Sequence, residues 1–354
     1  MLDVAAIPTD IWSLILPLAC TDGGFTGKSL AMTCSFFHMQ AYHFRFYSLA
    51  FDTLAKMESF LAFVRRQSGG FQPRITHLYI SYSDHPNNRS QWSWRTVVRM
   101  TDARFRLAFD TLLRLAAPNL QTLCVAQDWT PVTIQCSLPQ LEELIWMGST
   151  FLPDADVESG PDPGSPTIDK FNSDENSIFP ALKRIHIILS SLSRPLSPAL
   201  LRPLDVAANT LTHVRISNVD SATMSMGLIG ALTPDVYVGI FGQPPPTTSL
   251  FPSLVLPTLR YLTVQYILRG EHEAEARGSQ PPTTTVQVRD FEAHDGKIGR
   301  MYLLSDGEHI HTHWCNQLKE EWSDQIEGGY GYWVGRKEEE GARWKHSEST
   351  AVDT

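Results

Sequence analysis

The sequence has few cysteines and no long apolar run, and each shortage argues against a class of protein. The five cysteines are scattered and form no Cys-x-x-Cys pair, which disfavours a disulfide framework or a zinc ribbon and predicts a reducing compartment, the cytosol or the nucleus. The longest apolar stretch, residues 11–20, contains Ser13 and Pro17 and is far shorter than the roughly 20 residues that span a bilayer. Asp3 and Asp10 stand where a secretory signal would be basic, so we expect neither membrane insertion nor secretion.

Positive charge and catalytic signatures are also scarce. The net charge is −9 over 354 residues, and no block of Lys and Arg is long enough to follow a phosphate backbone, so nucleic acid is not expected as a ligand. The chain has no G-x-S-x-G elbow, P-loop, kinase-type loop, H-E-x-x-H motif or dinucleotide-binding glycine pattern. The glycine-aromatic run at residues 328–333 is typical of a turn. We therefore predict a protein with no catalytic residue and no cofactor of its own.

The sequence does contain an N-terminal stretch, residues 7–51, with two apolar runs at helical spacing. Thr9 and Asp10 can cap a first helix that is apolar on nearly every side. A second helical run is expected to open at Ser29, and residues 45–51 have the pattern of a short strand. The glycines expected to break the chain between the two runs are Gly23, Gly24 and Gly27.

The order and spacing of these pieces resemble the F-box in its fungal form. In that family an Ile/Leu-Pro pair leads into an acidic-Ile-Trp helix, followed by an acidic or glycine-bearing turn, a Ser-Leu-Ala helix and a strand with an Arg-Phe-x-Ser signature. The resemblance implies a three-helix domain over residues 1–51 that docks on a Skp-type adaptor. The matching residues are Ile7-Pro8, Asp10-Ile11-Trp12 with Ile15-Leu16, Thr21-Asp22-Gly23-Gly24, Ser29-Leu30-Ala31 with Cys34 and Phe37, and Arg45-Phe46-Tyr47-Ser48-Leu49.

The resemblance also implies which side chains contact the adaptor. They are apolar anchors of the kind that dominate helical interfaces. Trp12 is expected to pack inward against Phe36 or Phe44. Pro17 departs from the pattern, because it lacks an N–H and should end or kink the first helix before residues 18–20. The implied adaptor-binding residues are Ile7, Pro8, Ile11, Ile15, Leu16, Leu30, Cys34 and Phe37.

A short apolar unit recurs after a linking helix at residues 52–70, for which Asp52 or Thr53 is the expected cap. Each unit is an aliphatic residue, two variable residues, a second aliphatic residue, one variable residue and a further apolar residue. Such a unit predicts a short parallel strand with alternate residues in a shared core, stable only when neighbours stack on it. The six units are Ile75, Leu78 and Ile80; Leu120, Leu123 and Val125; Leu141, Leu144 and Trp146; Leu182, Ile185 and Ile187; Leu211, Val214 and Ile216; and Leu259, Leu262 and Val264.

These units resemble the leucine-rich repeat, in which a helix, a tight turn and a strand follow one another. Residues 102–116 and 197–208 precede a unit and have helical spacing. The distance between units is more variable than in regular repeats, so we predict an irregular leucine-rich-repeat-like α/β solenoid over residues 71–268. The alternative is an irregular α/β domain with several edge strands. An acidic loop rich in Pro, Gly and Ser is predicted at residues 154–176.

The C-terminal part, residues 269–334, is predicted to contain a hairpin and a helix. The hairpin is expected between residues 301–304 and 310–314, with a turn at the Ser-Asp-Gly-Glu between them. The helix is expected over residues 316–326. Residues 335–354 are mostly charged and are expected to form a disordered tail.

The second strand of that hairpin carries a cluster of metal-ligating residue types. On a strand, residues two apart share a face, so three imidazoles and a thiolate would point to one side, and all are ligands for zinc or copper. Ligands two apart diverge, so a closed site would need a second element such as His294 with Asp295. The alternative is an edge strand with its polar residues outward. The cluster consists of His309, His311, His313 and Cys315.

The patterns predict three N-terminal helices followed by an irregular solenoid, and the resemblance to the F-box implies the substrate-recognition subunit of an SCF-type ubiquitin ligase. The resemblance implies that cullin and RING subunits, reached through the adaptor, supply the chemistry while the repeats bind a protein substrate. The alternatives are a scaffold without ubiquitin transfer, a protein whose N-terminal helices only cap the solenoid, and a metal-binding protein. The strand positions expected to face a substrate are His77, Tyr79, Arg184, His186, His213, Arg215, Arg260 and Tyr261.

Overall fold

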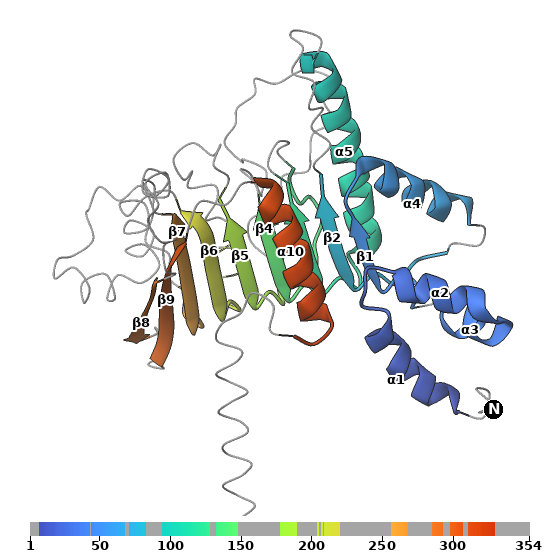
Figure 1. Cartoon of the computed structure of the whole chain (residues 1–354), viewed down its shortest axis with the longest axis horizontal. Helices are drawn as coiled ribbons and strands as arrows, with labels where there is room; N and C mark the ends of the chain where they lie inside the picture. Colours follow the sequence, from blue (N-terminus) through green and yellow to red (C-terminus); the bar gives the residue numbers. More distant parts are fainter. Residues whose placement is uncertain are drawn as a thin grey trace, which may run out of the picture.

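The structure is a computed structural model of the whole chain (Figure 1). It describes residues 7–42, 44–67, 71–82, 94–127, 132–147, 178–189, 204, 207, 209–219, 256–267, 285–292, 298–306 and 311–329. Several sequence predictions lie outside these residues. They are the acidic loop at 154–176, most of the helix at 197–208, residues 330–333 of the glycine-aromatic run, His294 with Asp295, His309, and the tail at 335–354.

One mainly parallel sheet organises the described part of the chain. Its strands are β1 (Ser48–Phe51), β2 (His77–Ser81), β3 (Thr122–Ala126), β4 (Glu143–Met147), β5 (Arg184–Ile188), β6 (His213–Val219), β7 (Tyr261–Ile267), β8 (Thr285–Glu292) and β9 (Ile298–Asp306). Their order across the sheet is β1-β2-β3-β4-β5-β6-β7-β9-β8. Neighbours from β1 to β9 are parallel, and only the last pair, β9 with β8, is antiparallel. The predicted α/β class with parallel strands is confirmed.

Each of the six apolar units gives one strand, from β2 to β7. The register places the central residue of each unit beside that of the next, as with Leu78, Leu123 and Leu144. All three apolar residues of every unit are buried in one hydrophobic core. Because residues two apart on a strand share a face, the second and third apolar positions of a unit point together into this core.

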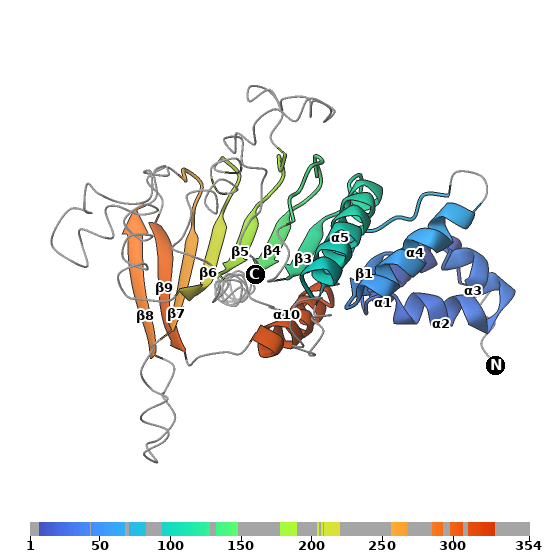
Figure 2. The ribbon, with the colours of Figure 1, turned by 90° about the horizontal axis from the view of Figure 1, so that it is seen from above.

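Helices lie over both faces of the sheet (Figures 1 and 2). On the core face, α4 (Leu54–Arg66) contributes Met57 and α5 (Trp94–Ala116) contributes Phe105 and Phe109. The ring of Phe109 lies 6.3 Å from that of Trp146 in an edge-to-face arrangement. α5 begins earlier than the predicted residue 102. Among the described residues, no helix combines the length and apolarity needed to cross a membrane.

On the opposite face, α10 (His311–Ile326) lies near β2 and β3 (Figure 1). Its Leu318 and Trp322 are fully buried in a second apolar cluster with Tyr79, Cys124 and Ile145 of the sheet. The ring of Trp322 lies 5.6 Å from that of Tyr79. This part of the sheet is therefore covered on both sides.

The C-terminal hairpin and helix are present, but their limits differ from the prediction. β8 and β9 form the antiparallel pair. The predicted hairpin strand at residues 310–314 is wrong, because residues 311–314 belong to α10. Helical residues at i, i+3 and i+7 share a side, so extending the helix toward its N-terminus buries Cys315 with Leu318 and Trp322. The alternating pattern of this segment fits a strand as well as a helix, and burial against the sheet favours the helix.

The linking helix begins where the sequence predicted, at a threonine cap. The side-chain oxygen of Thr53 accepts a hydrogen bond from the N–H of Lys56 at 3.3 Å. Thr53→Ala should lower the free energy of unfolding by about 1 kcal/mol in urea titrations, since it removes a partner from the first turn. Thr111→Ala is the matched control, because the Thr111 hydroxyl donates to the carbonyl of Leu107 inside α5 and caps nothing. An equal loss in both variants would contradict the capping role.

Candidate functional site

Three short helices stand at one end of the sheet, beyond β1 (Figures 1 and 2). They are α1 (Thr9–Ala19), α2 (Phe25–Thr33) and α3 (Ser35–Gln40). The second predicted run is split, because Cys34 is extended and separates α2 from α3. α2 starts at Phe25 rather than Ser29, and Gly27 lies inside it instead of breaking the chain, so these two expectations are wrong.

The turn between α1 and α2 is fixed by polar contacts to both neighbours. The carboxylate of Asp22 accepts hydrogen bonds from the N–H of Thr26 (2.8 Å) and from its hydroxyl (2.6 Å), which satisfies an amide in the first turn of α2. Ser48 of β1 donates to the carbonyl of Thr21 (3.0 Å) and accepts from the N–H of Gly23 (3.1 Å). Gly23 has φ of +72°, which glycine adopts without strain. The helices are thereby anchored on the first strand.

α1 continues through its proline. The N–H of Cys20 donates to the carbonyl of Leu16 at 2.9 Å, so the helix does not end at Pro17. A proline removes only its own N–H, and Ser13, whose carbonyl loses that partner, is exposed to water. The helix begins directly after Pro8 without a side-chain cap, so the predicted threonine or aspartate cap is wrong.

The inward face of α1 packs against α3. Leu16 is 1% exposed and Cys20 is fully buried. The ring of Trp12 meets Phe37 at 5.0 Å and Phe36 at 6.2 Å, both edge to face, which confirms the predicted inward packing of Trp12. Burial raises the pKa of the Cys20 thiol to about 11, so this cysteine is a structural residue and not a nucleophile.

The outward face of α1 is apolar as well, and no described side chain covers it. Its side chains recur at helical spacing and form one line, which we call the α1 stripe. Their exposed fractions range from 40% to 78%. A helix with apolar side chains on both sides is normally buried on both sides. The α1 stripe consists of Ile7, Ile11, Leu14, Ile15 and Leu18.

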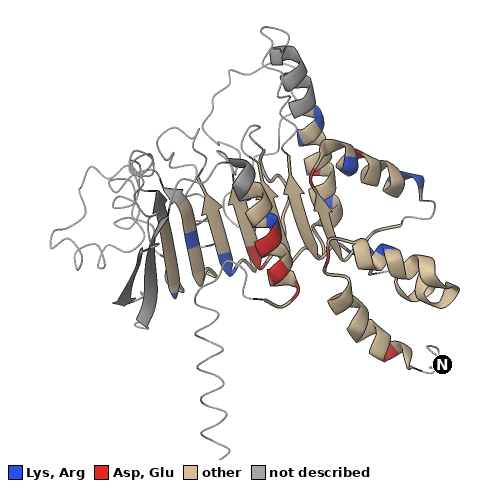
Figure 3. Cartoon of the chain, in the orientation of Figure 1, with Lys and Arg blue, Asp and Glu red and all other residues tan. Residues whose placement is uncertain are grey.

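Charge is nearly absent from these helices (Figure 3). Between residues 7 and 42 the chain has only Asp10, Asp22 and Lys28 as acidic or basic side chains, histidine aside. Asp22 is already bound to Thr26. The surface around the α1 stripe is thus suited to an apolar partner and not to a strongly charged one.

The predicted adaptor-binding residues fall into three groups. Leu16 requires a correction, because its burial inside the helices keeps it from any partner. Leu30 and Phe37 are partly exposed. The predicted residues that are exposed are Ile7, Pro8, Ile11, Ile15 and Cys34. The exposed apolar residues that the prediction missed are Leu14, Leu18, Phe25, Met32 and Met39.

A signal for part of the missed set was present in the sequence. Leu14 and Leu18 stand three and seven residues after Ile11, on the same side of a helix. The spacing that identified the helix therefore also identified its outward line. Which of two apolar sides is covered, however, depends on the tertiary structure.

Four of the strand positions predicted to face a substrate lie in the interior. Tyr79 is 1% exposed and donates its hydroxyl hydrogen to the carbonyl of Cys315 in α10 at 2.9 Å. His186 is fully buried, with Nε2 2.9 Å from Oγ of Ser217. His213 and Arg215 are buried as well, so the prediction is wrong for all four, because no substrate can reach a buried side chain. The other four positions, His77, Arg184, Arg260 and Tyr261, are partly exposed.

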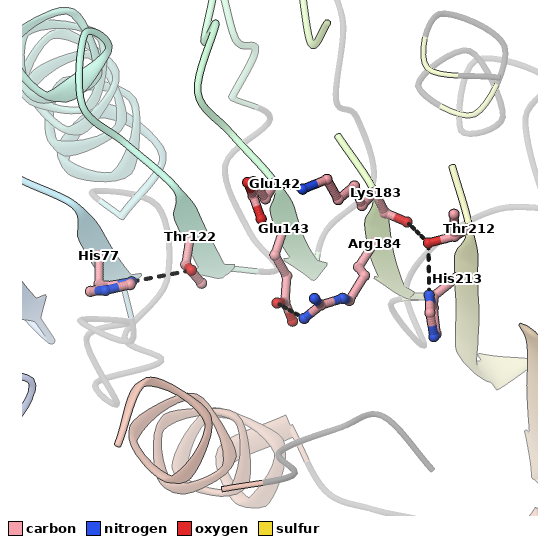
Figure 4. A network of polar contacts seen from close by, with 8 residues as sticks. All are labelled: His77, Thr122, Glu142, Glu143, Lys183, Arg184, Thr212 and His213. Carbon is pink, nitrogen blue, oxygen red and sulfur yellow. Dashed lines mark hydrogen bonds and ion pairs between the residues drawn. The ribbon is translucent and has the colours of Figure 1, made fainter. Parts of the chain in front are cut away.

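A row of polar side chains crosses the parallel strands at their first residues, and most of it is visible in Figure 4. Arg184 and Glu143 form an ion pair at 3.3 Å. Nδ1 of His77 lies 3.2 Å from Oγ1 of Thr122. The row, in register from β2 to β7, is His77, Thr122, Glu143, Arg184, His213 and Tyr261.

The histidines on this face of the sheet are held uncharged. The ring of His213 stacks on that of Tyr261 at 4.5 Å, and burial together with the charge of Arg184 lowers the pKa of His213 to about 3. Burial lowers the pKa of His77 to about 4. Burial and the charge of Arg215 lower the pKa of His186 well below its usual value. The lowered pKa values favour the neutral form of all three imidazoles near pH 7.

Three of the four residues of the C-terminal histidine and cysteine cluster lie on a helix, and His309 is outside the described residues. His311, His313 and Cys315 belong to α10, so the predicted strand, and with it the common face of a strand, is wrong for these three residues. Cys315 is buried, with its sulfur 4.0 Å from the carbonyl oxygen of Ala126. Within the described ranges, no group of three or more His, Cys, Asp and Glu side chains could hold a metal ion.

A scan against protein-family models and searches of curated proteins and of solved structures find no match to this chain. Among the described residues, the α1 stripe is the longest line of exposed apolar side chains, whereas the sheet carries α4, α5 and α10 on its faces.

Proposed function

We propose that the chain is the substrate-recognition subunit of an SCF-type ubiquitin ligase. In this proposal residues 7–51 are an F-box that binds a Skp-type adaptor. The parallel strands and their helices form an irregular leucine-rich-repeat-like solenoid that binds a protein substrate. The observation that carries the proposal is the α1 stripe, an exposed apolar line on the helix whose sequence resembles the first F-box helix.

Exposed apolar side chains are concentrated at this end of the molecule. Of the nine large hydrophobic side chains exposed among the described residues, eight lie between Ile7 and Met39, and the ninth is Leu107 on α5. Folded monomers normally scatter such residues singly, so a cluster supports a docking surface. The exposed side chains of Phe25, Met32 and Met39 extend this apolar surface from α1 onto α2 and α3.

The number of side chains in the α1 stripe limits the binding free energy that it can provide. Full burial of an aliphatic side chain contributes about 1.5–3 kcal/mol, whereas association costs about 4–15 kcal/mol in lost freedom. The five residues of the stripe only just offset that cost. A stable complex therefore needs further contacts, for which Phe25, Met32 and Met39 on α2 and α3 are exposed.

In this proposal the chain would hold the substrate in place, and its partners would carry out ubiquitin transfer. Holding a substrate beside a charged ubiquitin-conjugating enzyme raises the local concentration of the reacting groups without a catalytic residue in this chain. On the strands, the side chains left for a substrate are partly exposed ones such as Arg184, Arg260 and Tyr261. The α1 stripe lies beyond β1, whereas Arg184 is on β5 and Tyr261 is on β7, farther along the sheet (Figure 1).

Calorimetry of the full-length chain with a purified Skp-type adaptor tests the proposal. We expect an equimolar complex with a micromolar or lower Kd and little dependence on salt, because the helices carry almost no charge. An absence of heat and of co-elution at high micromolar concentrations would contradict it. A reconstituted ubiquitin-transfer assay then separates a ligase subunit from a scaffold, because a scaffold would bind the adaptor without transfer.

A further inference from the structure

The guanidinium group of Arg45 lies among four aromatic rings at the base of the N-terminal helices. Its central carbon is 4.5 Å from the ring centre of Tyr42, 4.6 Å from Phe46, 5.7 Å from Phe63 and 5.7 Å from Phe71. A cation over the face of an aromatic ring within about 6 Å is attracted by the ring's negative face. We call these four rings the Arg45 cage.

The cage is built from segments that are separate in the sequence. Tyr42 lies two residues after the end of α3, Phe63 belongs to α4, and Phe71 lies on the segment that leads into β2. The rings also contact one another, with Tyr42 5.4 Å and Phe46 5.8 Å from Phe71. One side chain therefore joins the N-terminal helices, the linking helix and the start of the repeated strands.

α2 contacts the backbone of the same residue. A Cβ placed on Gly27 would lie only 2.6 Å from Cα of Arg45, so a side chain at this position has no room. Gly27 is buried in α2. Arg45 is thus held by α2 at its backbone and by the Arg45 cage at its guanidinium group.

The guanidinium group has no carboxylate partner among the described residues, and its Nε has no hydrogen-bond partner. Burial lowers the pKa of Arg45, as expected for a cation partly removed from water without a counter-ion. The aromatic rings are the groups that compensate for this loss of water. A neutral side chain of similar length would lack that attraction.

We propose that Arg45 is a positioning residue that fixes the angle between helices α1, α2 and α3 and the sheet. It does so because the guanidinium group contacts Tyr42 and Phe46 beside it in the sequence, Phe63 of α4 and Phe71 before β2, and so links the N-terminal helices to both. The proposal concerns the free chain and does not depend on an adaptor. Its consequence is that the direction in which the α1 stripe points is set by this side chain together with the hydrogen bonds of Ser48 to the turn between α1 and α2.

Distances between two spin labels in the full-length protein test the proposal. Cys34 is exposed between α2 and α3 and takes the first label, and Gln121→Cys places the second on an exposed position just before β3. Cys136, which is partly exposed, is replaced by serine, and the remaining cysteines are buried. Pulsed electron resonance then reports the mean distance and its spread.

Arg45→Met should broaden the distance distribution about twofold while circular dichroism stays unchanged, because the methionine fills space without the cation. Arg45→Lys restores a cation and should keep the narrow distribution. The matched control is Arg104→Met, which removes an exposed arginine paired with Glu58 between α5 and α4 and should leave the spread unchanged.

A distribution in Arg45→Met with the same mean and width as wild type would overturn the proposal. Should that variant fail to fold, Phe71→Leu makes the same test, because it removes one ring of the cage and keeps an apolar side chain. Broadening in Phe71→Leu supports the proposal, and an unchanged width overturns it. Adaptor binding is not measured, so a failed adaptor experiment does not affect this result.

Discussion

Ile11→Asp is expected to abolish binding of the Skp-type adaptor while the chain stays folded. Ile11 is 44% exposed in the middle of the α1 stripe, so a carboxylate there meets water in the free protein. In a complex the same carboxylate would be buried in an apolar interface, at a cost of several kcal/mol, and each 1.4 kcal/mol weakens binding about tenfold. We expect at least about a hundredfold rise in Kd by calorimetry.

Leu107→Asp is the matched control for this substitution. Leu107 is 67% exposed on α5, away from the N-terminal helices, so the same change of side chain should leave the Kd unaltered. Leu18→Asp, at a 78% exposed position of the stripe, should match Ile11→Asp. Leu16→Asp should instead unfold the N-terminal helices, because Leu16 is buried. Wild-type affinity in both Ile11→Asp and Leu18→Asp would disprove the stripe as the docking surface.

The folded protein is expected to lose stability steeply between pH 6.5 and pH 5. His186 and His213 are buried, and with His77 they have folded-state pKa values below the ordinary 6.5. In this window the unfolded chain therefore binds protons that the folded chain does not, so stability is complete above pH 6.5 and falls as the pH is lowered. Each histidine contributes a slope of about 1.4 kcal/mol per pH unit.

Urea unfolding at several pH values measures this effect, and the slope of the unfolding free energy gives the number of protons taken up. His186→Gln removes one of the three titrating groups and retains a hydrogen-bonding side chain toward Ser217. We expect its slope near pH 5.5 to be smaller than that of wild type by about one proton. A wild-type stability that is constant from pH 7 to pH 5 would show that these rings are not buried as neutral groups.

Some of the N-terminal site followed from sequence and some did not. Helical spacing located α1, and Phe36 was anticipated as a partner of Trp12, whereas the nearer ring is Phe37, which had been expected to contact the adaptor. The position of Leu16 was not, because α1 is apolar on both sides and its sequence does not say which side meets α3. The split at Cys34 was also missed, since a change of backbone direction at one residue leaves the apolar spacing on either side intact.

The sequence alone determined the six parallel strands from β2 to β7. The alternation in each unit, from Leu78 and Ile80 to Leu262 and Val264, is a local property, and period two on a pleated backbone directs those residues to one face. A local pattern does not specify what covers the other face. Tyr79 and His186 became interior residues, and Cys315 became part of a helix, through packing between segments far apart in the chain. Such contacts depend on which surfaces meet, and only the tertiary structure decides that.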